Sequence, residues 1–156
     1  MGNTRKERIT KLVVIIGLVV VPLAAHAHGK ATGIVRERMD LMTAIGDAVK
    51  NVAGMVRGKT EFDGERAAAA AREIANHASG MTALFPADNA NQHSEALPAI
   101  WDNWTEFEKI ANELNVTADK LAISAMNATS SDQIQPAFSA VGKTCGACHE
   151  KFRIKK

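Results

Sequence analysis

Five consecutive residues near the C-terminus carry the clearest chemical signal in this 156-residue sequence. They are Cys145, Gly146, Ala147, Cys148 and His149, and they read Cys-x-x-Cys-His. On a helix the two thiols and the imidazole lie at positions i, i+3 and i+4, so they share one face. This is the attachment pattern of c-type haem, in which both thiols bond to the porphyrin and the adjacent imidazole binds the iron. The motif therefore predicts one haem c, covalently bound through Cys145 and Cys148, with His149 on the metal.

Three other chemistries use cysteines at this spacing. A thioredoxin-like redox pair belongs near a βαβ pattern, and the sequence shows no strand pattern. A structural zinc site needs four ligands, whereas the motif supplies three without a second cluster. A disulfide fits an oxidising compartment but leaves the adjacent histidine unexplained. Haem attachment uses all three side chains, so we favour it, and a thiol or metal-binding bundle without haem is the alternative.

The first 27 residues have the three parts of an export signal. Residues 1–11 are basic, residues 12–25 are apolar, and Ala25-His26-Ala27 is a small-x-small cleavage site. The competing interpretation is a membrane anchor, but the apolar run is short for a bilayer span and Pro22 interrupts its end. We therefore expect a signal peptide at 1–27 and a mature domain at 28–156, located in the periplasm without stable membrane insertion.

The leader also accounts for the basic character of the sequence. The whole chain has 19 Lys and Arg against 17 Asp and Glu, and the leader holds four of the basic residues and one of the acidic ones. The expected mature chain thus carries 15 basic and 16 acidic residues, a net charge of −1. The sequence has no basic stripe interleaved with aromatic residues, so we expect no nucleic-acid partner. It also shows no nucleophile–base pair and no nucleotide-binding loop, so we do not expect an enzyme.

Apolar residues recur at three- and four-residue steps in four segments, which predicts four helices. The first spans about residues 32–55. The second begins after Asp63, a plausible N-cap, and its apolar stripe continues toward Leu84 before Pro86 closes the segment. A polar loop follows at 87–97.

The third and fourth predicted helices lie in the C-terminal part of the sequence. Pro98 is well placed to begin the third helix, which extends to about residue 125 and has a weak point, a candidate bend or break, at 115–117. Ser131 or Asp132 caps the last helix, whose apolar stripe includes both cysteines. Four amphipathic helices joined by short and medium loops predict an all-α fold, an antiparallel four-helix bundle able to enclose one haem.

Haem attachment on the last helix of an exported four-helix bundle resembles the class II cytochromes c, the cytochrome c′ family. The resemblance covers nearly all of residues 28–156. Three stretches carry it: Gly58 with Glu61-Phe62-Asp63, Pro98 with Ile100-Trp101, and Val141 through Arg153, which contains the haem motif. It implies a periplasmic monohaem cytochrome that carries single electrons between redox proteins.

The resemblance implies two kinds of iron site. In the low-spin branch a methionine of the first helix is the second axial ligand, and alignment on the first interhelix turn places Met42 there. In the high-spin branch the distal site is open and binds NO or CO, which is the alternative function. A methionine on a buried helix face is by itself an ordinary packing residue, and Met39 is the competing candidate. We favour the low-spin branch, with His149 and Met42 on the iron.

Two arginines follow from the same resemblance. Arg38 matches an arginine that approaches a haem propionate, and Arg153 matches one near the imidazole side of the haem. Arg153 also has a simpler role, as a cation that stabilises the end of the last helix. His77 and His93 are expected to be polar surface residues and not iron ligands.

Other residues are expected to serve packing. Three methionines are predicted in the core: Met55, Met81 and Met126. Three small residues of the first helix would permit a homodimer through close helix approach, or equally serve internal packing: Ala44, Gly46 and Ala48.

Overall fold

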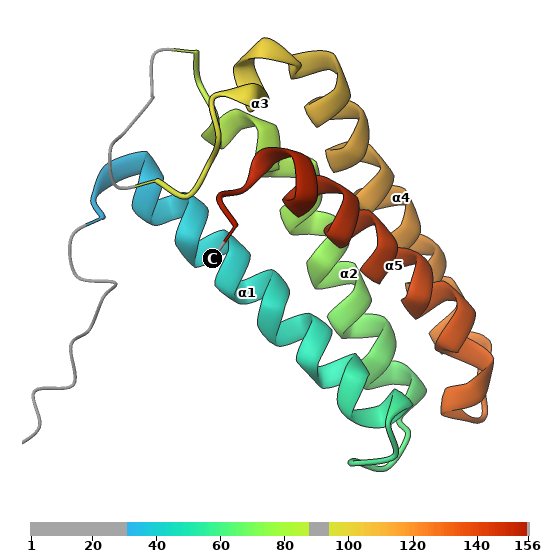
Figure 1. The fold of residues 1–156 in the computed structure, drawn as a ribbon. Helices are drawn as coiled ribbons and strands as arrows, with labels where there is room; N and C mark the ends of the chain where they lie inside the picture. The colour runs from blue at the N-terminus through green and yellow to red at the C-terminus, as the bar shows by residue number, and fades with distance from the viewer. Residues whose placement is uncertain (1–30, 88–93, 156) are drawn as a thin grey trace, which may run out of the picture.

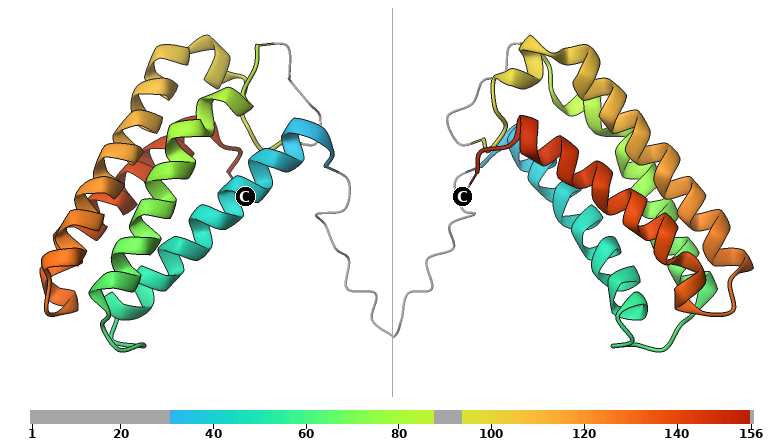
Figure 2. Two further views of the ribbon diagram at one scale, coloured as in Figure 1. Left: turned by 180° about the vertical axis from the view of Figure 1, so that it is seen from behind. Right: turned by 45° about the vertical axis from the view of Figure 1, so that its right-hand side comes forward.

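The computed structural model describes residues 31–87 and 94–155. The predicted leader at 1–27 lies outside these residues, as does His93. Within the described part, four long helices run alternately up and down and form an antiparallel bundle (Figures 1 and 2). They are α1 (Gly33–Val56), α2 (Gly64–Gly80), α4 (Trp104–Asn127) and α5 (Ser131–Phe152). The prediction of an all-α four-helix bundle is confirmed.

The turn between α1 and α2 is set by local residues. Gly58 has a φ of +64°, a left-handed conformation that glycine adopts at little cost. Asp63 is the N-cap of α2, and its carboxylate accepts a hydrogen bond of 2.9 Å from the backbone N–H of Arg66. The predicted cap is therefore confirmed. α2 ends at Gly80, and the stretch predicted to continue toward Leu84 is a separate 3₁₀ helix, η1 (Met81–Leu84).

α2 and α4 pack closely against each other because most of the buried side chains of α2 are small. The buried alanines of α2 are Ala67, Ala68, Ala70, Ala71, Ala75 and Ala78. At one end, a Cβ added to Gly64 would lie 2.6 Å from the carbonyl oxygen of Ala125, so the two backbones approach too closely for a larger residue. This pair of helices forms the closely packed half of the bundle.

The third helical segment differs from its prediction. The break falls at Asn103, between α3 (Ala99–Asp102) and α4, and α4 is continuous through 115–117. Asn115 does not interrupt the helix, because its amide donates to the carbonyl of Ala75 on α2 at 2.9 Å. Long-range hydrogen bonding thus stabilises α4 where local propensity is weak.

The position of the actual break is explained by the hydrogen bonds that Trp101 of α3 makes to the segment after η1. The indole N–H of Trp101 lies 3.2 Å from the carbonyl oxygen of Phe85 and 3.0 Å from that of Pro86. Trp101 therefore ties α3 to the segment after η1, while α4 takes a new direction from Asn103. The last helix begins at Ser131 with Ser130 as its N-cap, one residue before Ser131 and two before Asp132, the two caps predicted.

The packing predictions were right for two of the three methionines. Met55 and Met81 are buried, but Met126 is 51% exposed, so its assignment to the core was wrong. Met126 is the second-last residue of α4, where few neighbouring side chains remain to cover it.

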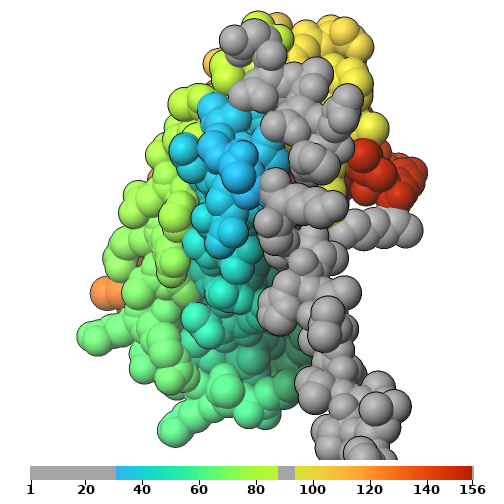
Figure 3. All heavy atoms as spheres, turned by 90° about the vertical axis from the view of Figure 1, so that its left-hand side faces the viewer, coloured from blue at the N-terminus to red at the C-terminus, as the bar shows by residue number. Residues whose placement is uncertain are grey.

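Ala48 is buried in the core and therefore serves internal packing. The exposed side of α1, which runs beside α2 in Figure 3, carries ion pairs between Arg36 and Asp40 and between Lys50 and Asp47. A homodimer remains a prediction. Among the described residues, no helix combines the length and apolarity that a bilayer span requires.

Candidate haem site

The haem motif lies in the C-terminal half of α5, as its helical spacing predicted. Val141 and Thr144 are buried on the core side of the helix, and Cys145 and Cys148, one turn after each, are half-buried against the core. The two thiols are not joined in a disulfide. His149 follows on the exposed side. Both cysteines and the histidine are therefore presented together at one end of the bundle.

The environment favours protonated thiols and a neutral imidazole. Burial raises the pKa of the Cys145 thiol, and it raises that of Cys148, next to Cys145, to about 11. Burial lowers the pKa of His149, the nearby Arg153 acts in the same direction, and Glu95 acts in the opposite one. The neutral imidazole is the form that binds a metal, so His149 is ready for ligation at neutral pH.

Met42 is on the core side of α1. It is half-buried and packs against the core, one turn after Arg38 and one turn before Ile45, both of which are buried. Met39 is not among the described apolar residues that pack against the core. Of the two methionines considered from the sequence, Met42 is therefore the one that faces the interior.

α1 and α5 touch each other only in part, in contrast to α2 and α4. Both carry apolar side chains that are half-buried against the core: Leu41, Met42 and Val49 on α1, and Ala137, Phe138, Cys145 and Cys148 on α5. Half-buried apolar side chains on two loosely packed helices are what a flat apolar ring would cover. The residues present thus fit a porphyrin linked to α5.

Arg38 gives a second test of this fit. Its side chain is only 5% exposed, its Nε–H donates to the carbonyl of Leu84, and the guanidinium lies over the ring of Phe85, 4.3 Å from the centroid. Its two terminal nitrogens are buried without a hydrogen-bond partner among the described residues. Burial also lowers its pKa. A buried cation with unused donors requires an anion, and a haem propionate carboxylate meets that requirement.

An aromatic cluster supports the same end of the bundle. Phe107 lies at its centre, with ring centroids 4.9 Å from Phe85 and 5.5 Å from both Trp104 and Phe152. Phe152 is the last residue of α5, so the cluster fixes the helix just beyond the haem motif.

Arg153 lies one turn after His149, and its backbone N–H donates to the His149 carbonyl at 3.3 Å. Its guanidinium pairs with the carboxylate of Glu95, at 2.9 Å from Nε and 2.7 Å from Nη2. Glu95 was not identified from the sequence. It lies 58 residues earlier in a polar loop, and no local pattern connects such a position to the motif.

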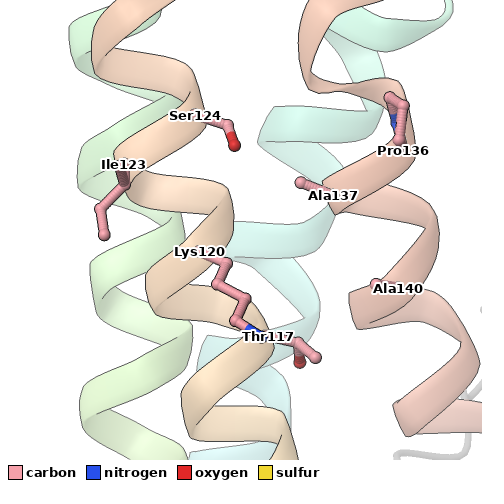
Figure 4. A pocket seen from close by; sticks show the side chains of 7 residues that line it. All are labelled: Thr117, Lys120, Ile123, Ser124, Pro136, Ala137 and Ala140. Carbon is pink, nitrogen blue, oxygen red and sulfur yellow. The ribbon is translucent and has the colours of Figure 1, made fainter.

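Other candidate positions lie away from the motif. His77 is on α2, 3.9 Å from the carboxylate of Glu73. The described residues contain no group of three or more His, Cys, Asp and Glu side chains that could hold a metal ion. A groove between α4 and α5 has Lys120 as the charged residue of its described lining, and neither cysteine borders it (Figure 4). The groove is therefore separate from the haem motif.

Comparison with known proteins gives a consistent result. A family model described as Cytochrome C′ matches residues 33–153. Cytochrome c-556 from Agrobacterium tumefaciens (strain II Chrys) is 33% identical over 126 residues, covering 80% of this chain and 99% of that protein. Cytochrome c-554 from Cereibacter sphaeroides is 31% identical over 151 residues, covering 94% and 97%.

The fold comparison agrees. The solved structure of cytochrome c′ from Rhodopseudomonas palustris superposes with a TM-score of 0.72 at 26% identity, covering 81% of this chain and 99% of that one. The family match extends from the first residue of α1 to the residue after α5, so it includes the whole bundle and the haem motif. The chain therefore belongs to the cytochrome c′ family, the class II c-type cytochromes, and carries one covalent haem c.

Proposed function

We propose that this protein is an exported carrier of single electrons, with His149 and Met42 as the two axial ligands of a low-spin iron. The observation that best supports this assignment is the placement of Met42 beside Arg38. Arg38 is buried with two unused donors, and Met42 follows it by one turn on the same core-facing side of α1. If a propionate meets Arg38, the thioether of Met42 is the nearest sulfur along that helix face.

When bound, the haem supplies the one-electron change between Fe(III) and Fe(II). The side chains of Cys145 and Cys148 anchor it through thioethers, which prevent its loss outside the cytoplasm. His149 would hold the iron through an imidazole nitrogen and Met42 through its thioether sulfur, a ligand set that favours the reduced state. Keeping both ligands in both oxidation states would make the reorganisation on electron transfer small. Contacts with redox partners are expected to be brief and of small area.

The proposal includes the route to the periplasm. Residues 1–27 act as a signal peptide that is removed after Ala27, so the mature protein begins at His28. The intact mass of protein purified from the periplasm tests this directly. A mass that retains the leader would instead support a membrane anchor.

The alternative function is gas binding at an open distal site, which requires Met42 to be away from the iron. The ferric visible spectrum distinguishes the two. A Met/His-ligated low-spin haem shows the weak long-wavelength band of sulfur–iron charge transfer and binds CO poorly. A five-coordinate iron lacks that band and binds CO readily.

The matched variants are Met42→Ala and Met39→Ala. We expect Met42→Ala to lose the sulfur–iron band and to gain CO binding, because it removes the distal ligand. Met39→Ala should leave the spectrum unchanged, since that residue does not pack against the core. An unchanged spectrum in Met42→Ala would remove Met42 from the iron, whereas a wild-type spectrum that lacks the sulfur–iron band would favour the gas-binding alternative.

A further inference from the structure

We propose that Glu95 and Arg153 are positioning residues that set the charge around the His149 imidazole, and through it the reduction potential of the haem. The inference rests on the proposed role of His149 as an iron ligand. It assigns a function to residues 95–97, in a stretch that the sequence marks only as polar.

The charge pair is held in place by backbone hydrogen bonds at both ends. The carboxylate of Glu95 accepts from Nε and Nη2 of Arg153 at 2.9 and 2.7 Å. Beside it, the backbone N–H of Leu97 donates to the carbonyl of Phe152 at 2.9 Å, and that of Ile154 donates to the carbonyl of Glu95 at 2.8 Å. These bonds form a short antiparallel bridge between the loop and the chain that leaves α5. The two charges are therefore fixed relative to the end of α5.

The pair also lies next to the proposed iron ligand. Arg153 follows His149 by one helical turn and bonds to its carbonyl. The Arg153 guanidinium and the Glu95 carboxylate paired with it place charges of opposite sign at this end of α5. Groups that surround a ligating histidine tune the metal through that ligand. Glu95 and Arg153 therefore place a negative and a positive charge near the same proposed iron ligand.

The sign of each effect follows from electrostatics. Fe(III) carries one more positive charge than Fe(II), so a carboxylate near the ligand stabilises Fe(III) and lowers the potential. A guanidinium at the same place stabilises Fe(II) and raises it. In the intact pair the two effects largely cancel. Because both side chains are close to half-exposed, solvent and salt screen each effect without removing it.

A purely structural role of the Glu95–Arg153 pair predicts a different result. If the pair only clamped the loop to α5, loss of either partner would lower stability in the same way and leave the potential nearly unchanged. Opposite shifts of the potential from the two single variants therefore distinguish electrostatic tuning from clamping.

The test uses the holoprotein and measures the midpoint potential by spectroelectrochemical titration at low ionic strength. Glu95→Gln is expected to raise the potential and Arg153→Gln to lower it. Carrying both substitutions should return the potential close to wild type, and Arg153→Lys should remain close to it because it keeps the positive charge. Thermal unfolding of all four variants shows whether a change in midpoint potential is accompanied by a change in stability.

Glu106→Gln is the matched control. Glu106 pairs with Lys151, which is also in the last turn of α5 but lies two residues after His149 and therefore on a different side of the helix. It should leave the potential unchanged. Shifts of the same sign in the two single variants, or shifts no larger than that of Glu106→Gln, would overturn the inference. Ligation by His149 is read separately from the wild-type spectrum, so a failure of the proposed function is distinguished from a failure of this one.

Discussion

The guanidinium of Arg38 lies 4.3 Å from the ring centroid of Phe85, stacked on an aromatic face inside the bundle. Stacking holds the cation in place, while its terminal nitrogens keep donors free for an anion. We expect Arg38→Met to lower the midpoint potential of the haem, since a buried positive charge stabilises Fe(II). It should also destabilise the holoprotein by about 1–3 kcal/mol, because a propionate would lose its partner. Redox titration and urea unfolding measure the two effects.

Arg36→Met is the matched control for this prediction. Arg36 is exposed on the other side of α1 and pairs with Asp40 at 2.9 Å. Its loss should change stability by less than about 1 kcal/mol, as expected for a surface ion pair. Equal effects of the two variants on the potential would show that Arg38 has no special relation to the haem.

The contact between Gly64 and Ala125 makes a prediction about packing. A Cβ at position 64 would lie 2.6 Å from a backbone oxygen of α4, and a backbone cannot yield as a side chain can. Gly64→Ala should therefore lower the free energy of unfolding by about 1–3 kcal/mol. At Gly80, the last residue of α2, a Cβ would meet nothing within 4 Å. Gly80→Ala is expected to be neutral or slightly stabilising in the same urea titration, and similar losses in both variants would contradict the steric explanation.

The thiols give a prediction for the chain before haem attachment. Burial raises the pKa of Cys148 to about 11 in the folded chain, whereas an unfolded thiol titrates near about 8.5. At a pH between these two pKa values, the Cys148 thiol is ionised in the unfolded chain but still protonated in the folded chain. A rise in pH therefore stabilises the unfolded state relative to the folded state. The free energy of unfolding of haem-free protein should thus be constant below about pH 8.5 and fall between about pH 8.5 and pH 11. Urea titrations across this range test it.

Cys148→Ala in the haem-free chain is the control for this prediction. It removes the titrating group, so the fall in stability with pH should become smaller. The same pH dependence in both chains would mean that Cys148 is not the group responsible. In the holoprotein the effect should be absent, because a thioether does not ionise.

Local patterns predicted the helices and the haem motif, but not the long-range interactions that support them. The cap at Asp63 and the common face of Cys145 and Cys148 depend on residues within one or two turns, so sequence spacing suffices. The break at Asn103 could not be read in this way. It depends on hydrogen bonds from Trp101 to carbonyls sixteen and fifteen residues earlier, whereas the weak segment around Asn115 is stabilised by a bond to another helix.

The sequence by itself determined which chemistry this protein performs, because two thiols and an imidazole at helical spacing share one face wherever that helix lies. It also determined the four apolar stripes that require a bundle. Only the tertiary structure decided that Arg38 is buried with unused donors and that Glu95 meets Arg153 beside His149. Burial and long-range charge pairing arise when segments far apart in the sequence pack together. A local sequence pattern does not show which of these segments come into contact.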